Sequence, residues 1–229
     1  MNSVKPQLIK LNKIKKFFKH KNGIIEIFKN VSFQVKPGDL VALVGPSGSG
    51  KSSLLNILAL LDKPTSGKIF LFGKDSSLLR PHDVDEIRRK KISIIFQDNN
   101  LLSDFTAVEN VLMPLIIRGD DYKLSFNKAI KVLKKVNLVN RSNHFPSEMS
   151  GGEQQRVAIA RSLIAETNLI LADEPTGNLD YKTSQEVFSY FIKLKKMKKA
   201  LIFATHNREL ANKADYKLSI SNGTVKRIH

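Results

Sequence analysis

The chain has 229 residues, of which 41% are hydrophobic, and this is enough for one sizeable core with room for a subdomain. It contains no cysteine, which excludes a disulfide framework and a thiolate metal site. The longest uninterrupted apolar run is five residues, too short for a transmembrane helix or for the core of a signal peptide. We therefore expect a cytoplasmic protein.

The formal net charge is +17, from 38 Lys and Arg against 21 Asp and Glu. Such a charge attracts nucleic acid, anionic lipid and nucleotide phosphates. The lysines are spread through nearly every segment, which is typical of a solvated surface rather than of one nucleic-acid-binding face. We expect no specific nucleic-acid partner. Attraction to an anionic membrane leaflet, about 1 kcal/mol for each well-placed lysine, stays open as an alternative.

The first part of the chain is predicted to be rich in β-strands. Residues 1–7 read as an unstructured lead. Alternating apolar residues predict strands at 8–11, 24–28 and 31–35, with turns at 21–23 and 36–39. The second turn delivers the chain into a further apolar strand.

A glycine-rich loop comes next, between an apolar strand at 40–44 and an apolar helix that includes 54–58. Its sequence, Gly45-Pro46-Ser47-Gly48-Ser49-Gly50-Lys51-Ser52, fits the pattern G-x-x-x-x-G-K-S. Glycines let successive backbone N–H groups surround a phosphate, and the helix start adds its free N–H groups. Lys51 supplies a cation for the β- and γ-phosphates, and the Ser52 hydroxyl is placed to coordinate Mg²⁺. An ordinary glycine turn is the alternative, but the flanking strand and helix favour nucleotide binding.

The rest of the chain alternates strands and helices around a helical middle. After the loop we predict a strand at 68–73, a charged helix near 84–90 and a strand at 92–96. The pattern from 98 to 165 is helical, with helices at 107–117, interrupted at Pro114, at 125–136, and from Gly152 onward. We then predict a buried strand at 169–172, a helix at 182–197, a buried strand at 200–204, and a hairpin of 216–220 with 224–228. The strand at 40–44 and the two later buried strands read as parallel and covered on both faces.

Polar residues follow three of the predicted strands. Asp173 and Glu174 end the strand at 169–172, where α/β sheets place their ligands, so Asp173 can hold Mg²⁺ and Glu174 can deprotonate an attacking water. His206 follows the strand at 200–204 and can contact a γ-phosphate or steady Glu174. Gln97 follows the strand at 92–96 and can sense Mg²⁺ or water. An acidic turn, a structural histidine and a capping glutamine are the alternative interpretations.

A second phosphate-binding pattern opens the helix near Gly152. The stretch is Met149-Ser150-Gly151-Gly152-Glu153-Gln154-Gln155-Arg156. Its hydroxyl, its two glycines and the helix start provide donors for an anion. The same residues also predict a capping box, with Ser150 as N-cap and Glu153 at N3, and both interpretations can hold together. The residues alone do not explain why one chain needs two phosphate sites.

With these motifs assembled, the whole chain from Leu8 to Ile228 resembles the nucleotide-binding subunit of an ABC transporter. The resemblance implies a P-loop NTPase of ABC type: an α/β fold with a RecA-like parallel-sheet core, an N-terminal antiparallel β subdomain and an inserted α-helical subdomain. The β subdomain and core would be 1–97 and 166–229, and the helical subdomain 98–165. In this family two copies pack head to tail, and each ATP lies between the loop of one copy and the Ser150 region of the other, which explains the two sites.

The resemblance also implies a role for each motif. The residues that would contact ATP are Phe18, Gly45, Pro46, Ser47, Gly48, Ser49, Gly50, Lys51, Ser52, Ser53, Ser150, Gly151, Gly152, Glu153 and Asp180. Ser52, Gln97 and Asp173 would hold Mg²⁺, and Glu174, His206 and Gln97 would be catalytic. The family usually has Tyr for stacking on adenine, so Phe18 is a departure, and Phe17 and core packing are the alternatives. Met149 replaces the usual Leu, Glu153 the commonest Gln, and Gly177-Asn178 the frequent Ser-Ala, and none of these changes removes a donor.

Two stretches resemble one branch of the family, the ATPases that drive release of lipoproteins from the inner membrane toward the outer membrane. They are residues 60–67 and 101–111. That branch implies a homodimer, integral membrane permease subunits as partners, lipoprotein as the indirect substrate, and a peripheral position on the cytoplasmic face of the inner membrane. The ATPases of macrolide exporters and of the cell-division machinery have similar stretches and are the alternatives, followed by a soluble ABC protein that acts on nucleic acid.

Overall fold

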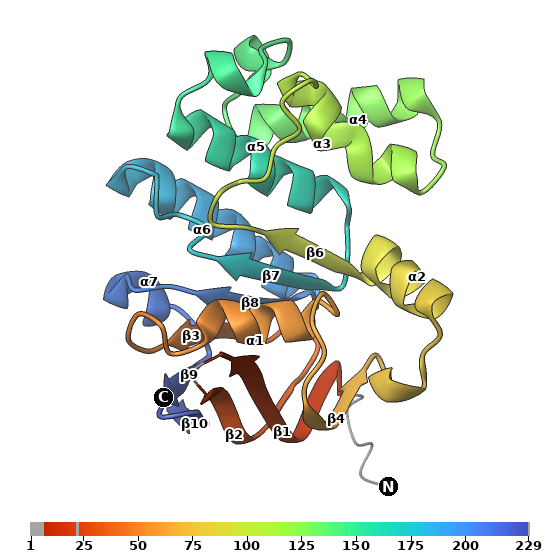
Figure 1. Ribbon diagram of the computed structural model, residues 1–229. Coiled ribbons are helices and arrows are strands. Elements are labelled where there is room, and N and C mark those ends of the chain that lie inside the picture. The colour runs from red at the N-terminus through yellow and green to blue at the C-terminus, as the bar shows by residue number, and fades with distance from the viewer. Residues whose placement is uncertain (1–6, 22, 229) are drawn as a thin grey trace, which may run out of the picture.

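The structure is a computed structural model that describes residues 7–21 and 23–228. The predicted lead at 1–7 lies outside the described residues except for Gln7, as does Asn22 of the predicted turn at 21–23. The chain forms two sheets and a separate group of helices that Figure 1 shows above them. Among the described residues, every helix is too short or too polar to cross a lipid bilayer.

The larger sheet carries the strands that lead to the predicted site. Its strand order is β10-β9-β3-β8-β7-β6, and all neighbours are parallel except β9 and β10. The strands are β3 (Leu40–Val44), β6 (Ile92–Ile95), β7 (Leu169–Asp173), β8 (Ala200–Ala204), β9 (Tyr216–Ser221) and β10 (Thr224–Ile228). Every residue of β8 is buried, as expected for a parallel strand covered on both faces. The predicted parallel arrangement and the closing hairpin are thus confirmed.

The smaller sheet is antiparallel, with the order β2-β1-β4-β5. Its strands are β1 (Ile9–His20), β2 (Gly23–Val35), β4 (Ser66–Leu71) and β5 (Lys74–Asp75). The short strands predicted at 8–11, 24–28 and 31–35 are parts of two long strands. Irregular register along β1 and β2 absorbs extra residues without ending the ladder, which is why the alternation breaks in the sequence while the pairing continues.

Helices cover both faces of the large sheet. Successive residues of β3 point to opposite sides, and apolar residues on both sides of the strand are buried. The helices are α1 (Lys51–Leu58), α2 (Pro81–Lys91), α6 (Tyr181–Lys196) and α7 (Arg208–Ala211). Val41 and Leu43 pack in one core with α1 and the small sheet, whereas Leu40 and Ala42 pack in another with α6. The short helix α7, which the sequence did not predict, begins after Asn207, whose side chain accepts a hydrogen bond from the backbone N–H of Leu210.

The helical group has its own hydrophobic core. Its helices are α3 (Ala107–Ile117), α4 (Tyr122–Lys135) and α5 (Gly151–Ile164), with short 3-10 turns at 139–141 and 146–148; a further 3-10 turn, at 76–78, follows β5 of the small sheet. The predicted interruption at Pro114 is wrong, because α3 continues through it. A proline removes one helical hydrogen bond, and here buried side chains on both sides of it, including Leu112 and Leu115, keep α3 packed against its neighbours.

Candidate functional site

The glycine loop joins the end of β3 to the start of α1. Gly48 and Gly50 have φ angles of 74° and 99°, which favour glycine. A Cβ atom on Gly45 would lie 2.5 Å from the carbonyl oxygen of Ile220, so the loop also requires glycine at this position. Gly50 is the N-cap of α1 and has no side chain to cap it, which leaves the first N–H groups of the helix available for an anion.

The Lys51 side chain folds back across this loop. Its ammonium group donates to the carbonyl oxygens of Gly45 at 2.9 Å and Pro46 at 3.1 Å. The cation therefore lies inside the curve of the loop, close to the N–H groups at the helix start. A phosphate there would meet backbone donors and a positive charge together.

Asp173, Glu174 and His206 meet at the carboxyl ends of β7 and β8, which are parallel neighbours. Glu174 has a φ of 45°, and its backbone N–H donates to the carbonyl oxygen of Ala204 at 3.0 Å. Its carboxylate oxygen Oε1 lies 2.9 Å from Nδ1 of His206, and the side chain of His206 is 79% exposed against 15% for Glu174. A residue that is not glycine but is held in the left-handed region is typical of functional sites.

A cavity of about 580 Å³ brings most of the predicted residues together. The predicted residues that line it are Gly45, Ser47, Gly48, Gly50, Lys51, Ser52, Ser53, Gln97, Asp173, Glu174 and His206. Its size is within the usual range for small-molecule sites. Pro46 and Ser49 belong to the same loop without lining the cavity. Ile27, Gly177 and Asn178 also line it, although the sequence did not assign them to the site.

The cavity suits a magnesium nucleotide better than a metal ion alone. Within the described residues, no three side chains of His, Asp or Glu come together as a metal site. The Ser52 hydroxyl, the Gln97 amide and the Asp173 carboxylate are hard oxygen donors around one cavity. Mg²⁺ is commonly held by one or two protein oxygens together with phosphate and water, and this donor set fits that pattern.

The second predicted phosphate site lies outside this cavity, at the start of α5. Ser150 is the N-cap of α5 and forms a capping box with Glu153, as predicted: its Oγ accepts from the Glu153 N–H at 3.3 Å, and Glu153 accepts from the Ser150 N–H at 2.8 Å. The hydrogen bond from the Ser150 N–H is the largest cause that holds the pKa of Glu153 below its usual value, and the Ser150 hydroxyl and Arg141 lower it further. Gly151 is exposed, and a Cβ on Gly152 would lie 3.3 Å from the carbonyl oxygen of Asn178.

Asp180 and Phe18 also lie outside the cavity. Asp180 is the N-cap of α6, and hydrogen bonds from the hydroxyl and the backbone of Thr183 hold the pKa of its carboxyl below the usual value. The ring of Phe18 is exposed and carries the Lys16 ammonium 4.6 Å from its centroid, whereas Phe17 is half-buried. Phe18 is thus the better placed of the two to offer a ring face to a base.

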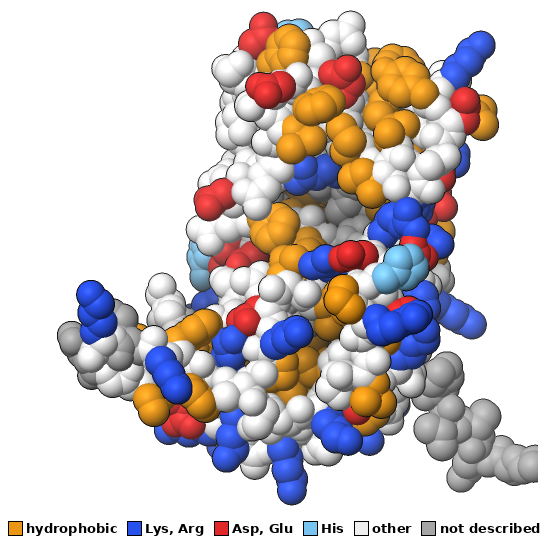
Figure 2. Space-filling model, turned by 45° about the vertical axis from the view of Figure 1, so that its right-hand side comes forward, with side chains coloured by type: hydrophobic (Ala, Val, Ile, Leu, Met, Phe, Trp, Pro, Cys, Tyr) orange, Lys and Arg blue, Asp and Glu red, His pale blue; other side chains and the backbone are white. Residues whose placement is uncertain are grey.

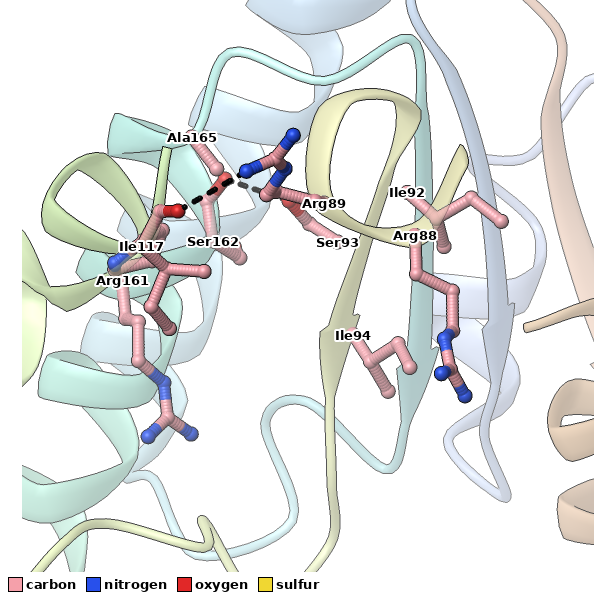
Figure 3. A pocket seen from close by; sticks show the side chains of 10 residues that line it. Arg88, Arg89, Ile92, Ser93, Ile94, Ile117, Arg161, Ser162 and Ala165 are labelled. Atoms are coloured by element: carbon pink, nitrogen blue, oxygen red, sulfur yellow. Dashed lines mark hydrogen bonds between the residues drawn. The ribbon is translucent and has the colours of Figure 1, made fainter. Parts of the chain in front are cut away.

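A cleft of about 190 Å³ lies between β6 and the helical group. Apolar and basic side chains line it, including Ile92, Ile94, Ile117, Arg88 and Arg161, as Figure 3 shows. Figure 2 shows hydrophobic side chains gathered over the helical group above a hollow with basic residues at its rim. The exposed apolar residues of that group include Leu102, Phe105, Ile117, Tyr122 and Leu124.

Comparison with known proteins agrees with this geometry. The family model described as ABC transporter matches residues 28–177. The chain belongs to the ABC transporter family. Its relatives include the lipoprotein-releasing system ATP-binding protein LolD of Rickettsia typhi, 46% identical over 216 residues that cover 94% of this chain and 96% of LolD. An uncharacterized ABC transporter ATP-binding protein of Thermotoga maritima is 44% identical over 89% of this chain and 87% of its own.

The solved structures similar to this ABC transporter ATPase include two of the cassette MJ0796. One is a dimeric, post-hydrolysis state bound to ADP and Pi, with a TM-score of 0.92 and 37% identity over 96% of this chain and 97% of that chain. The other is a dimeric bacterial ABC transporter cassette, with a TM-score of 0.92 and 38% identity over the same shares. The predicted fold class and the predicted ATPase activity are thereby confirmed.

Two residues of this ABC transporter ATPase were not predicted from sequence although they hold parts of the segment that follows Gln97. Asn110 is fully buried in α3 and hydrogen-bonds to the backbone of Leu102, Phe105 and Thr106. Arg161 reaches from α5 to the loop that follows Gln97. Neither stands in a recognisable nucleotide motif, so only the folded chain reveals them.

Proposed function

We propose that the cavity binds ATP with Mg²⁺ and hydrolyses the γ-phosphate. Lys51 contacts the β- and γ-phosphates together with the backbone N–H groups of 47–53, while Ser52, Gln97 and Asp173 hold the ion, which neutralises developing negative charge when bound. Glu174 orients the attacking water and takes its proton. The observation that carries this assignment is the 2.9 Å contact between Glu174 and His206 at the rim of a loop built for phosphate.

We further propose that two copies close head to tail to complete each site. The start of α5 supports this, because Ser150, Gly151 and Gly152 open a helix outside the cavity of their own chain. In the dimer these residues and Glu153 cover the nucleotide of the other copy, with Asp180 beside it. Phe18 stacks on adenine, since its ring is exposed. Both MJ0796 structures are described as dimeric, which supports the same arrangement here.

The proposed partners are integral membrane permease subunits similar to LolC and LolE. The single ABC domain of 1–229 would consist of 1–97 and 166–229 as β subdomain and core, with 98–165 as the helical subdomain that faces the permeases. The apolar surface of the helical group and the neighbouring cleft support this contact. The similarity to LolD supports a peripheral position on the cytoplasmic face of the inner membrane and a role in releasing lipoproteins toward the outer membrane.

ATP turnover and binding test the site assignment separately. Glu174→Gln should lower kcat by roughly 10²–10⁴-fold, the usual contribution of a general base, while ATP affinity stays near that of the unmodified chain. Lys51→Ala should raise the Kd for ATP roughly 10- to 100-fold, because hydrogen bonds to a charged group are worth about 1.5–3 kcal/mol. Glu186→Gln, on the exposed side of α6, is the matched control. Near-normal turnover by Glu174→Gln would remove the base assignment.

Copurification from membranes tests the transport role. We expect permeases of the LolC and LolE type to accompany the intact complex, and the chain alone to bind ATP but hydrolyse it poorly. Recovery of an exporter permease or of a division-complex permease would select the corresponding alternative. Steeply salt-dependent binding to DNA or RNA without any membrane partner would instead favour a soluble role.

A further inference from the structure

The chain makes an unusual bend directly after Gln97. Asn99 and Asn100 have φ angles of 60° and 46°, so two successive residues other than glycine lie in the left-handed region. Asparagine tolerates this region better than most residues, but a pair in sequence needs outside support. Asn99 is buried, whereas Gln97 and Asp98 beside it are exposed. The bend therefore anchors one end of the segment that carries Gln97 into the cavity.

The outside support comes from Arg161, on the last turns of α5. One guanidinium nitrogen donates to the carbonyl oxygen of Asn99 at 2.7 Å, and the other donates to that of Asn100 at 2.8 Å. Burial lowers the pKa of Arg161 from its usual value. In Figure 3 the Arg161 guanidinium hangs below α5, well apart from Arg88 on the other side of β6.

The planar guanidinium matters because its two nitrogens are held at a fixed separation. Two successive backbone carbonyls in a left-handed bend accept from this fork at once. A lysine ammonium is a single point of charge and cannot hold both carbonyls with the same geometry, and an apolar side chain holds neither. The bend thus depends on the type of cation and not only on its charge.

We propose that Arg161 is a positioning residue that fixes the bend after Gln97 to α5, so that Gln97 and the Ser150 end of α5 move as one body. The helix from Gly151 to Ile164 is continuous, and ten residues of helix span about 15 Å. A shift of Gln97 toward or away from the cavity is therefore carried to the donors that the chain offers to a second copy. The functional part of this inference rests on the proposed ATP site.

A spin label on the loop tests the clamp directly. The chain has no cysteine, so Asp98→Cys gives one labelling site on an exposed residue next to Gln97. We expect Arg161→Met to increase the mobility of the label, and Arg161→Lys to do so to a lesser degree. Arg88→Met, which removes a cation from the same cleft without touching the loop, should leave the mobility unchanged. Equal mobility in all variants would overturn the clamp.

Turnover of the same substitutions, in chains without the label and its cysteine, tests the consequence for catalysis. We expect Arg161→Met to lower kcat by roughly 10- to 100-fold, the scale of a misplaced group near the reacting atoms, and to raise the Mg²⁺ concentration needed for half-maximal rate. The KM for ATP should change by about twofold or less, because the loop of 45–53 is intact. If Arg161→Met does not fold, Arg161→Lys decides both measurements.

These outcomes separate the inference from the proposed function. Absence of ATP turnover in the unmodified dimer or complex would reject the proposed function, while the spin label would still decide whether Arg161 holds the bend. Normal turnover by both Arg161 variants, with an active unmodified chain, would reject Arg161 as a positioning residue even if the label became mobile.

Discussion

Replacing Asn110 by leucine should destabilise the chain far more than its distance from the cavity suggests. The Asn110 amide is fully buried and makes bonds to the backbone of the loop before α3: Oδ1 accepts from the Leu102 N–H at 2.8 Å, and Nδ2 donates to the carbonyl oxygens of Leu102, Phe105 and Thr106 at 2.9–3.1 Å. Leucine has a similar volume, so the change removes these bonds without opening a large cavity.

The magnitude depends on which backbone groups keep another partner. The Leu102 and Thr106 carbonyls also accept from the backbone N–H groups of Phe105 and Asn110. The Leu102 N–H and the Phe105 carbonyl have no other protein partner among the residues that the structure describes. An unpaired group costs about 1–3 kcal/mol when it is buried, and Leu102 and Phe105 are themselves partly exposed, so Asn110→Leu should lower the free energy of unfolding by about 2 kcal/mol.

Urea denaturation followed by circular dichroism measures this loss. Asn127→Leu, on the exposed side of α4, is the control and should change the free energy of unfolding by about 0.5 kcal/mol or less. A loss below about 1 kcal/mol for Asn110→Leu, with an unchanged m-value, would mean that water replaces the amide without cost. The bonds would then not be what holds the loop.

Three further substitutions test other parts of the structure. Gly67→Ala should lower the free energy of unfolding in urea denaturation by about 2–4 kcal/mol, because the new Cβ would lie 2.5 Å from the Lys13 carbonyl oxygen at a φ of 95°. The control, Gly73→Ala, has open space around it and should lower that free energy by about 1 kcal/mol. The pKa of Glu153 is lowered on folding, so the ionised carboxylate stabilises the fold above its unfolded pKa, and this stabilisation is lost as pH falls through its folded pKa. Glu153→Gln should therefore lower the free energy of unfolding at pH 7 and match the unmodified chain in strong acid, as denaturation across pH will show. Phe18→Ala should weaken ATP binding about tenfold in calorimetry, since stacking is worth about 1–3 kcal/mol, and leave tripolyphosphate binding unchanged.

The residues of the cavity were predictable from sequence because each is marked by a local pattern. The loop from Gly45 to Ser52 needs only its own glycines and the strand and helix beside it. Glu174 and His206 follow buried strands, and parallel strands end at the same edge of a sheet. The chain order of these strands does not matter for this argument, so the two side chains were expected together before their 2.9 Å contact was known.

The contacts that hold the surroundings of the cavity were not predictable in this way. Arg161 bonds to Asn99 and Asn100 across about sixty residues of sequence, and arginine in the last turn of a helix is ordinarily a solvated end. Pro114 illustrates the opposite error, since a local rule for proline was overridden by packing on both sides of α3. Such features depend on which segments meet in space, which periodicity along the chain does not reveal.

Helix α5 contacts both hydrophobic cores and the loop that follows Gln97. Its Ile159 packs in the core of the large sheet with α6, while Val157 and Ala160 pack in the separate core of the helical group. The helix is therefore anchored in both cores, and Arg161 attaches it to the loop that carries Gln97. If Arg161 holds the bend as we propose, a rotation of the helical group that moves α5 would also move the segment that carries Gln97. The proposed coupling between the cavity and the surface that would face the permeases therefore involves few contacts: helix α5 and the hydrogen bonds of the Arg161 guanidinium connect the two.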